Sequence, residues 1–137
     1  MKNLFVPYEQ ALHLKELGFN EGCFGYYVLT ETRDYKNGLE IRNEIELNTL
    51  NGYRVNDDES QTTAPLYQQA FRWFREKHGL YHFIGLDVMN MSSLDDINKF
   101  AFKTAIFNSK MDGYDAGNYK SFEEAELACI KKLIQIV

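Results

Sequence analysis

The sequence predicts a single α+β domain over residues 1–137, with the element order α-β-β-α-β-β-α and a mostly antiparallel sheet packed by helices. Three observations predict this class. Amphipathic helical segments begin, divide and end the chain, and a pair of strand-like segments lies in each interval between them. The 137 residues are 45% hydrophobic and include only 2 prolines and 9 glycines, which leaves little of the chain for linkers. Strands that follow one another between helices favour hairpins and hence antiparallel pairing.

The first half of the chain reads as one helix and two strands. A helix is predicted over residues 6–17, because Pro7 suits an opening turn and Gly18 follows as a C-cap. Aromatic and β-branched residues over 23–30 predict a strand. A second strand is predicted over 39–47, where apolar and charged residues alternate.

The hairpin between these two strands has a register that the side chains can select. A two-residue loop at Asn37-Gly38 would set Glu31 opposite Glu44, and like charges across a ladder are unfavourable. A three-residue loop over 36–38 avoids that pair and gives Gly38 the left-handed position. The expected partners are then Tyr35 and Leu39, Leu29 and Ile45, and Tyr27 and Leu47.

The middle of the chain reads as a loop followed by a helix. Polar and acidic residues over 48–63 predict a long mobile loop. The helix is expected to start with Thr63 as its cap and Pro65 near its first turn, and to end before Gly79. Trp73 falls at the boundary of its apolar face, where we expect a half-exposed side chain. That face is centred on Leu66, Tyr67, Ala70 and Phe74.

The last part of the chain adds a second strand pair and a final helix. Strands are predicted over 80–88 and 100–107, joined by a polar connection over 90–98. A glycine-rich connection is expected over 112–117. Ser121 and Glu124 then form a capping box, and a wide apolar arc follows it.

Charge and cysteine usage exclude several classes of protein. The net charge is -5, and residues 31–60 hold eight acids and four bases, whereas no stripe of lysine and arginine exists. We therefore expect no nucleic-acid binding through phosphates. No apolar run reaches the length of a secretory or membrane segment, so no membrane association is expected. Cys23 and Cys129 lie in apolar segments and read as buried free thiols, which favours the cytoplasm.

Motifs for metals, cofactors and catalysis are weak. His78 and His82 have helical ligand spacing, but Gly79 between them ends the helix. The stretch from Asp112 to Glu123 has the length of a calcium loop but lacks ligands at its third and fifth positions. The Phe24-Gly25-Tyr26 run lacks the basic neighbour of an RNA-stacking strand. We predict no metal site, no cofactor and no catalytic residue, and favour a protein that is not an enzyme.

Three stretches together carry a resemblance. They are Phe5-Val6-Pro7-Tyr8-Glu9-Gln10-Ala11 with Cys23-Phe24-Gly25-Tyr26-Tyr27, then Ala64-Pro65-Leu66-Tyr67-Gln68-Gln69 through Trp73-Phe74-Arg75-Glu76-Lys77-His78-Gly79, then Glu123-Glu124-Ala125-Glu126-Leu127. About half of the chain resembles a group of small uncharacterised proteins from phages and prophage-like regions of gut bacteria. The resemblance implies an accessory protein of a mobile element that acts in the bacterial cytoplasm. It implies no activity and no functional residue.

Three functions follow as hypotheses. The first is a non-enzymatic interaction or self-assembling module that binds a host protein, a phage protein or a second copy. Its binding edge would be Trp73 with Tyr67 and Phe71, because amphipathic aromatics anchor interfaces. The second is a small-molecule or nucleotide-binding protein of counter-defence type, which requires a concave pocket with converging polar groups. The third is a small hydrolase, which a pocket lined by Asp or His with a shifted pKa would favour.

Overall fold

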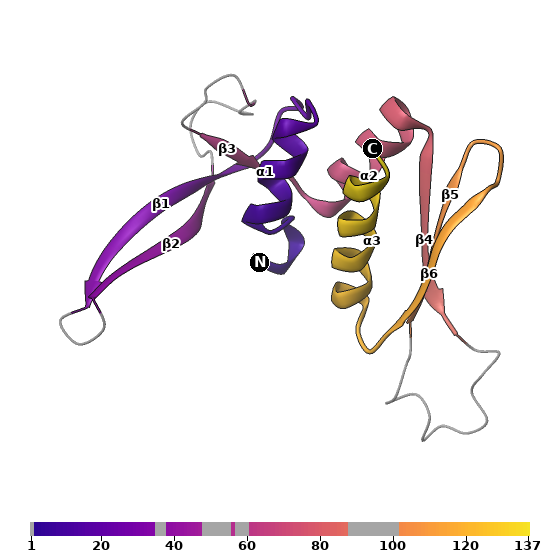
Figure 1. Ribbon diagram of the computed structural model, residues 1–137. Coiled ribbons are helices and arrows are strands. Elements are labelled where there is room, and N and C mark those ends of the chain that lie inside the picture. Colours follow the sequence, from indigo (N-terminus) through magenta and orange to yellow (C-terminus); the bar gives the residue numbers. More distant parts are fainter. Residues whose placement is uncertain (1, 35–37, 48–55, 57–60, 88–101) are drawn as a thin grey trace. The chain divides into compact units, whose positions relative to one another are not determined.

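In the computed structural model of the chain, residues 2–34, 38–47, 56, 61–87 and 102–137 are described (Figure 1). They form two compact units, Met1–Leu66 and Tyr67–Val137. Both units combine helices with an antiparallel three-stranded sheet, which confirms the α+β class. The element order among the described residues is α-β-β-β-α-β-β-β-α, with one more strand in each interval than we expected. That the units make one domain stays a prediction.

The first unit begins with a capped helix. Its elements are a short 3-10 turn (Lys2–Leu4), α1 (Tyr8–Glu16), β1 (Gly25–Asp34), β2 (Gly38–Leu47) and β3 (Thr62–Ala64). Pro7 is the N-cap of α1, just before the first turn in which we expected it. Gly18 after the end of the helix has a φ of +92°, as the sequence predicts for a C-cap glycine. The Phe19 amide donates to the Leu14 carbonyl at 2.8 Å, which completes the glycine-dependent C-cap.

The sheet of this unit has the order β2-β1-β3, and its hairpin register differs from the expected one. Tyr27 pairs with Ile45, not Leu47, and Asp34 pairs with Gly38, so the expected partners are wrong by two positions. Alternation of side chains distinguishes the two faces of a strand, but it does not distinguish registers that differ by two residues. The expected loop over 36–38 is also shifted, because Gly38 belongs to β2; residues 35–37 lie outside the described ones.

Strand β3 occupies a segment that we expected to be loop and helix cap. Thr62–Ala64 pairs with the first residues of β1, so Thr63 does not cap a helix. The physical reason is Pro65, because the residue before a proline is disfavoured in helical conformation and prefers an extended one. The Pro65 carbonyl accepts from the Val6 amide at 2.9 Å, which ties β3 to the N-terminal segment. The rest of the expected mobile loop, 48–60 apart from Asn56, lies outside the described residues.

Both cysteines are buried free thiols, as expected from their apolar neighbourhoods. Burial raises the pKa of the Cys23 thiol to about 11, against a smaller lowering effect of the nearby Thr63. A thiol with so high a pKa stays protonated at neutral pH and is unreactive as a nucleophile.

The second unit places two helices on one side of a three-stranded meander (Figure 1). Its elements are α2 (Tyr67–His78), β4 (Leu80–Leu86), β5 (Phe102–Asn108), β6 (Gly113–Tyr119) and α3 (Phe122–Ile136). The sheet order is β4-β5-β6. Helix α2 ends before Gly79, which has a φ of +63° as a C-cap glycine should. The predicted connection over 90–98 lies outside the described residues.

Strand β6 replaces the glycine-rich connection that we expected over 112–117, so that expectation is wrong. Its residues pair with β5 from Phe102 opposite Tyr119 to Phe107 opposite Gly113. Glycine and aspartate disfavour strands intrinsically, but pairing with a neighbouring strand overrides that preference. Gly117 also lies under the Tyr119 ring, since an added Cβ would come within 2.7 Å of the Tyr119 hydroxyl oxygen.

Helix α3 has the N-terminal cap that the sequence predicts. The Ser121 hydroxyl oxygen accepts from the Glu124 amide at 3.2 Å. The Glu124 carboxylate accepts in return from the amide of Lys120, one residue before the cap. The apolar arc of α3 is buried at Ala125, Cys129, Ile130 and Leu133.

Candidate functional site

A pocket of about 430 Å³ opens between α2, β4 and α3, wholly within the second unit. Its volume lies in the range of small-molecule sites. The side chains that line it are Gln68, Gln69, Phe71, Arg72 and Arg75 from α2, His82 from β4, and Phe122 and Glu126 from α3. Polar groups from three elements therefore converge on an aromatic-lined cavity.

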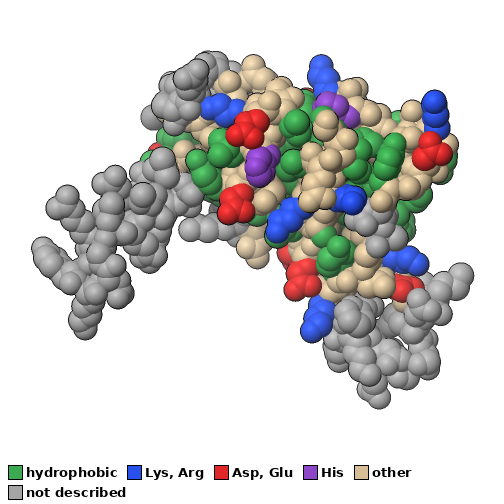
Figure 2. Space-filling view, in the orientation of Figure 1, with side chains coloured by type: hydrophobic (Ala, Val, Ile, Leu, Met, Phe, Trp, Pro, Cys, Tyr) green, Lys and Arg blue, Asp and Glu red, His purple; other side chains and the backbone are tan. Residues whose placement is uncertain are grey.

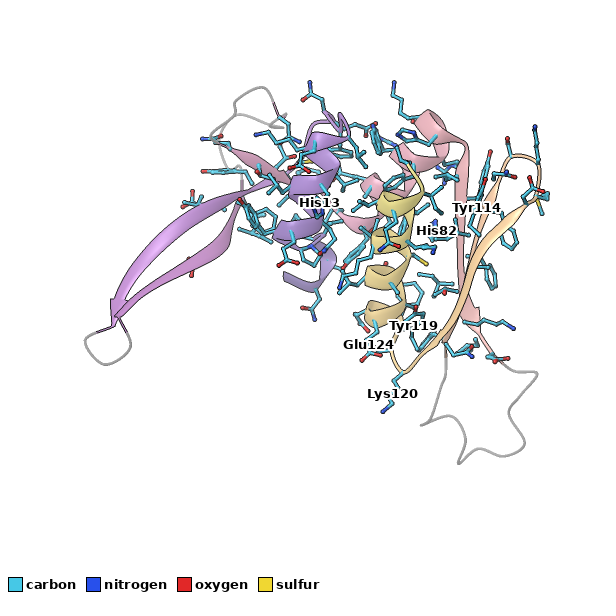
Figure 3. The ribbon with its side chains drawn as sticks, viewed as in Figure 1. His13, His82, Tyr114, Tyr119, Lys120 and Glu124 are labelled. Carbon is cyan, nitrogen blue, oxygen red and sulfur yellow. The ribbon has the colours of Figure 1, made fainter. Side chains whose placement is uncertain are left out.

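The periods of helix and strand explain why these side chains meet. Gln68, Arg72 and Arg75 follow one another at spacings of four and three, which places them on one face of α2. Phe122 and Glu126 are four apart and share a face of α3. His82 points from β4 to the side of the sheet that the helices cover (Figure 3), together with the buried Leu80.

An aromatic stack forms one side of the pocket. The rings of Phe71 and His82 are stacked with their centroids 3.6 Å apart, and Tyr67 extends the stack, 6.1 Å from Phe71. Burial, and to a smaller extent the positive charge of Arg75, lowers the pKa of His82 to about 4. His82 is therefore a neutral imidazole at pH 7, and the stack carries no charge.

Glu126 is a carboxylate on the apolar side of α3. Its side chain is only 8% exposed, and burial, with a smaller effect of Glu123, raises its pKa above the usual value. Glu126 lines the pocket, and among the described residues the buried side-chain polar atom without a hydrogen-bond partner is the Thr63 hydroxyl oxygen, not a Glu126 oxygen. Burial, followed by the charge of Glu126, raises the pKa of the neighbouring Tyr67 to about 12. A carboxylate oxygen accepts hydrogen bonds, so Glu126 is the pocket residue that a ligand with N–H donors would contact.

Two arginines border the pocket on α2. Both Arg72 and Arg75 are exposed, and the Nε atom of Arg72 lies 4.0 Å from a carboxylate oxygen of Glu76. A guanidinium group presents several N–H donors in one plane and binds carboxylates and phosphates in pairs of hydrogen bonds. The border of the pocket is thus suited to an anion, whereas Glu126 is suited to a hydrogen-bond donor.

The structure separates the three residues that the sequence places at an interface edge. Phe71 lines the pocket and Tyr67 stacks beside it, but Trp73 packs instead against Phe74 and His78, with ring centroids 5.1 and 4.7 Å away. We expected Trp73 to be half exposed, but its side chain is 4% exposed, and Tyr67 and Phe71 are 5% and 4% exposed. Their part in a partner contact stays a prediction.

Sequence reasoning missed Glu126 and weighed His82 only as a metal ligand, although both left a signal as pocket residues. Glu126 lies four residues after Phe122 and four before Ile130, so a carboxylate interrupts the apolar arc of the last helix. His82 alternates with Leu80 and Ile84 on the face of a strand that packs against helices. A polar residue at an apolar position of an amphipathic element was the available indication in both cases.

His78 and His82, which have helical ligand spacing in the sequence, lie on different elements. Helix α2 ends at His78, and Gly79 turns the chain so that His82 lies on β4. Across the described residues, no group of three or more His, Cys, Asp or Glu side chains is placed to hold a metal ion. Likewise, no described helix is both long and apolar enough to span a membrane.

Charged side chains do not gather into one basic area on the face that Figure 2 shows. Among the coloured residues, Lys and Arg alternate with Asp and Glu and with hydrophobic side chains. Hydrophobic side chains are also exposed on the sheet of the second unit, where Tyr81 and Phe83 are 45% and 56% exposed. These two lie on the face of β4 opposite His82.

Comparison with known proteins found no matching family model, no matching curated protein and no matching solved structure.

Proposed function

We propose that this chain is a small-molecule-binding protein whose ligand occupies the pocket between α2, β4 and α3. The observation that carries the proposal is the lining of this pocket, where the Glu126 carboxylate, two arginines and two phenyl rings lie around one space. A concave site lined by aromatic side chains and a few polar groups is typical of small-molecule binding.

The lining of the pocket favours binding over catalysis. It includes no serine, threonine, cysteine or lysine that could act as a nucleophile, and Glu126 is its one carboxylate among the described residues. His82 has a lowered pKa, which on its own would favour a hydrolase, but Phe71 covers one face of its ring. The imidazole is better suited to building the wall of the pocket than to moving between a nucleophile and a leaving group.

Ligand-observed NMR tests the proposal with a panel of nucleoside monophosphates, amino acids, sugar phosphates, dicarboxylic acids and polyamines. We expect at least one compound to bind the wild-type chain and to lose binding in the Glu126→Gln and Arg75→Gln variants. The matched controls are Glu16→Gln and Lys77→Gln, because both residues are exposed and neither lines the pocket. A panel without a binder, or a binder that the pocket variants retain fully, would contradict the proposal.

A second candidate function is self-association through the open face of the β4-β5-β6 sheet. The exposed Tyr81 and Phe83 pair with Phe107 and Ala105 across β4 and β5, which makes one apolar area. Lys103, at the end of this area, is the one charged residue at these positions of the two strands, so two copies could meet without a row of like charges. This candidate agrees with the self-assembling protein that the sequence suggests, but it places the contact on the sheet and not at Trp73, Tyr67 and Phe71.

Sedimentation velocity tests self-association. We expect a dimer that the Phe83→Glu variant converts to monomer and that the Lys77→Gln control leaves intact. A wild-type chain that stays monomeric at concentrations of about 100 μM, where weak homodimers form, would eliminate this candidate.

A further inference from the structure

We propose that the ligand of the pocket is a guanine mononucleotide, with its base at Glu126 and its phosphate between Arg72 and Arg75. This inference rests on the proposed small-molecule function and names the ligand class. It follows from three features of the lining, each of which selects one part of such a ligand.

The carboxylate of Glu126 selects the base. An ionised carboxylate is an acceptor only, and its two oxygens match two adjacent N–H donors. The edge of guanine presents such a pair, N1–H beside the N2 amino group, whereas adenine presents an acceptor at N1. Glu126 is 8% exposed and lines the pocket, so this pair of donors would bind its two oxygens from the pocket side.

The two arginines select the phosphate. Arg72 and Arg75 are three residues apart on α2 and line the pocket together. Guanidinium groups bind phosphate oxygens through paired, charge-assisted hydrogen bonds. The pocket thus has cations on α2 and the Glu126 carboxyl group on α3, which is the complement of an anionic phosphate joined to a base with N–H donors.

The phenyl rings select a flat ligand. Phe122 is 42% exposed although it lies on the apolar arc of α3, and it lines the pocket with Phe71. A planar base packed against Phe122 would remove this ring from water. The base would contact the edge of the Phe71 and His82 stack, not enter between the rings, because their centroids are already 3.6 Å apart.

Titration calorimetry on the full chain tests the inference with guanosine monophosphate, adenosine monophosphate, guanosine and inorganic phosphate. We expect guanosine monophosphate to bind about tenfold more tightly than each of the other three, since one paired set of hydrogen bonds discriminates by about that factor. Glu126→Gln should abolish the preference over adenosine monophosphate. Arg75→Gln should weaken guanosine monophosphate about tenfold and leave guanosine unchanged. Glu16→Gln and Lys77→Gln are the controls.

Equal affinity for the guanine and adenine nucleotides would overturn the inference, and this comparison uses only the wild-type chain. A guanine-containing single-stranded tetranucleotide that binds more tightly than guanosine monophosphate would also overturn it, because the ligand would then be a nucleic acid. If another compound of the panel binds and the pocket variants lose it, the ligand class is wrong and the small-molecule function stands. If no compound binds, both fail.

Discussion

The imidazole ring of His82 lies almost parallel to the phenyl ring of Phe71, with an angle of 13° between their planes and 3.6 Å between their centroids. The stack joins β4 to α2 within the second unit and forms part of the pocket wall. It also explains why His82 is neutral at pH 7, since a charged imidazole in this position would lose hydration without gaining an anionic partner.

Stability should fall in mildly acidic solution because of His82. The unfolded chain binds a proton near pH 6.5, whereas the folded chain, with a His82 pKa of about 4, does not. The free energy of unfolding therefore decreases as the pH falls from about 6.5 to about 4, by at most about 1.4 kcal/mol per pH unit. His82→Phe, which keeps an aromatic ring but cannot titrate, should reduce this slope in urea denaturation. The control variant His13→Gln, at an exposed position, should keep the wild-type dependence of the free energy of unfolding on pH. Equal slopes in wild type and His82→Phe would show that His82 does not cause this dependence.

Glu126→Gln should stabilise the protein without ligand at neutral pH. The pKa of Glu126 is raised in the folded state, so the folded chain holds a proton that the unfolded chain releases above about pH 4.5. Ionisation of this carboxylate lowers the free energy of unfolding as the pH rises through the pKa of the folded state. The effect is absent below the pKa of the unfolded state. Thermal unfolding should show a higher Tm for the variant at pH 7.5 and no difference near pH 4. A variant less stable than wild type at pH 7.5 would show that Glu126 has a favourable partner in the folded chain.

Removal of the cap of α3 should destabilise the second unit. In Ser121→Ala the Glu124 amide loses its acceptor, which costs about 0.5–2 kcal/mol of the free energy of unfolding. Ser109→Ala, at an exposed turn position, is the matched control and should cost little. Urea denaturation measures both. Equal losses would show that the cap contributes nothing specific.

Trp73→Ala distinguishes a packing residue from an interface anchor. The side chain is 4% exposed and packs against Phe74 and His78, so we expect a loss of about 3–5 kcal/mol with the oligomeric state unchanged. Denaturation and sedimentation on the same samples give both quantities. A small loss of stability together with the loss of an oligomer would instead identify Trp73 as the anchor that its position on the helical wheel suggests.

Local signals predicted the helices well and the sheets only in part. Gly18 and Gly79 mark helix ends through backbone geometry and Ser121 marks one through its hydroxyl group, as the sequence predicts. Pro7 lies one position before the start of α1, and the helix cap expected at Thr63 is wrong. Strands depend on partners distant in the chain. The sequence therefore did not reveal β6, whose residues have low strand propensity, or the two-residue shift in the β1–β2 register.

The candidate site was predictable only at its aromatic part. Phe71 and Tyr67 were singled out as aromatics of an amphipathic helix, but for a partner contact and not for a pocket. The pocket includes both Glu126 and His82, which are 44 residues apart in the chain. No local sequence pattern predicts that α3 and β4 pack against each other. A polar residue within an apolar arc indicates that one residue could line a pocket, but it does not indicate which residues of other elements line the same pocket.

Chemical-shift mapping of the backbone amides tests the central claim, a small-molecule site between α2, β4 and α3, most directly. The isotope-labelled chain is titrated with guanosine monophosphate, and with any other compound of the panel that binds. The account predicts shifts that saturate with the ligand at Gln69, Arg72, His82 and Glu126, while the amides of α1 stay in place. Shifts confined to residues outside the pocket, or no shift with any compound, would contradict it.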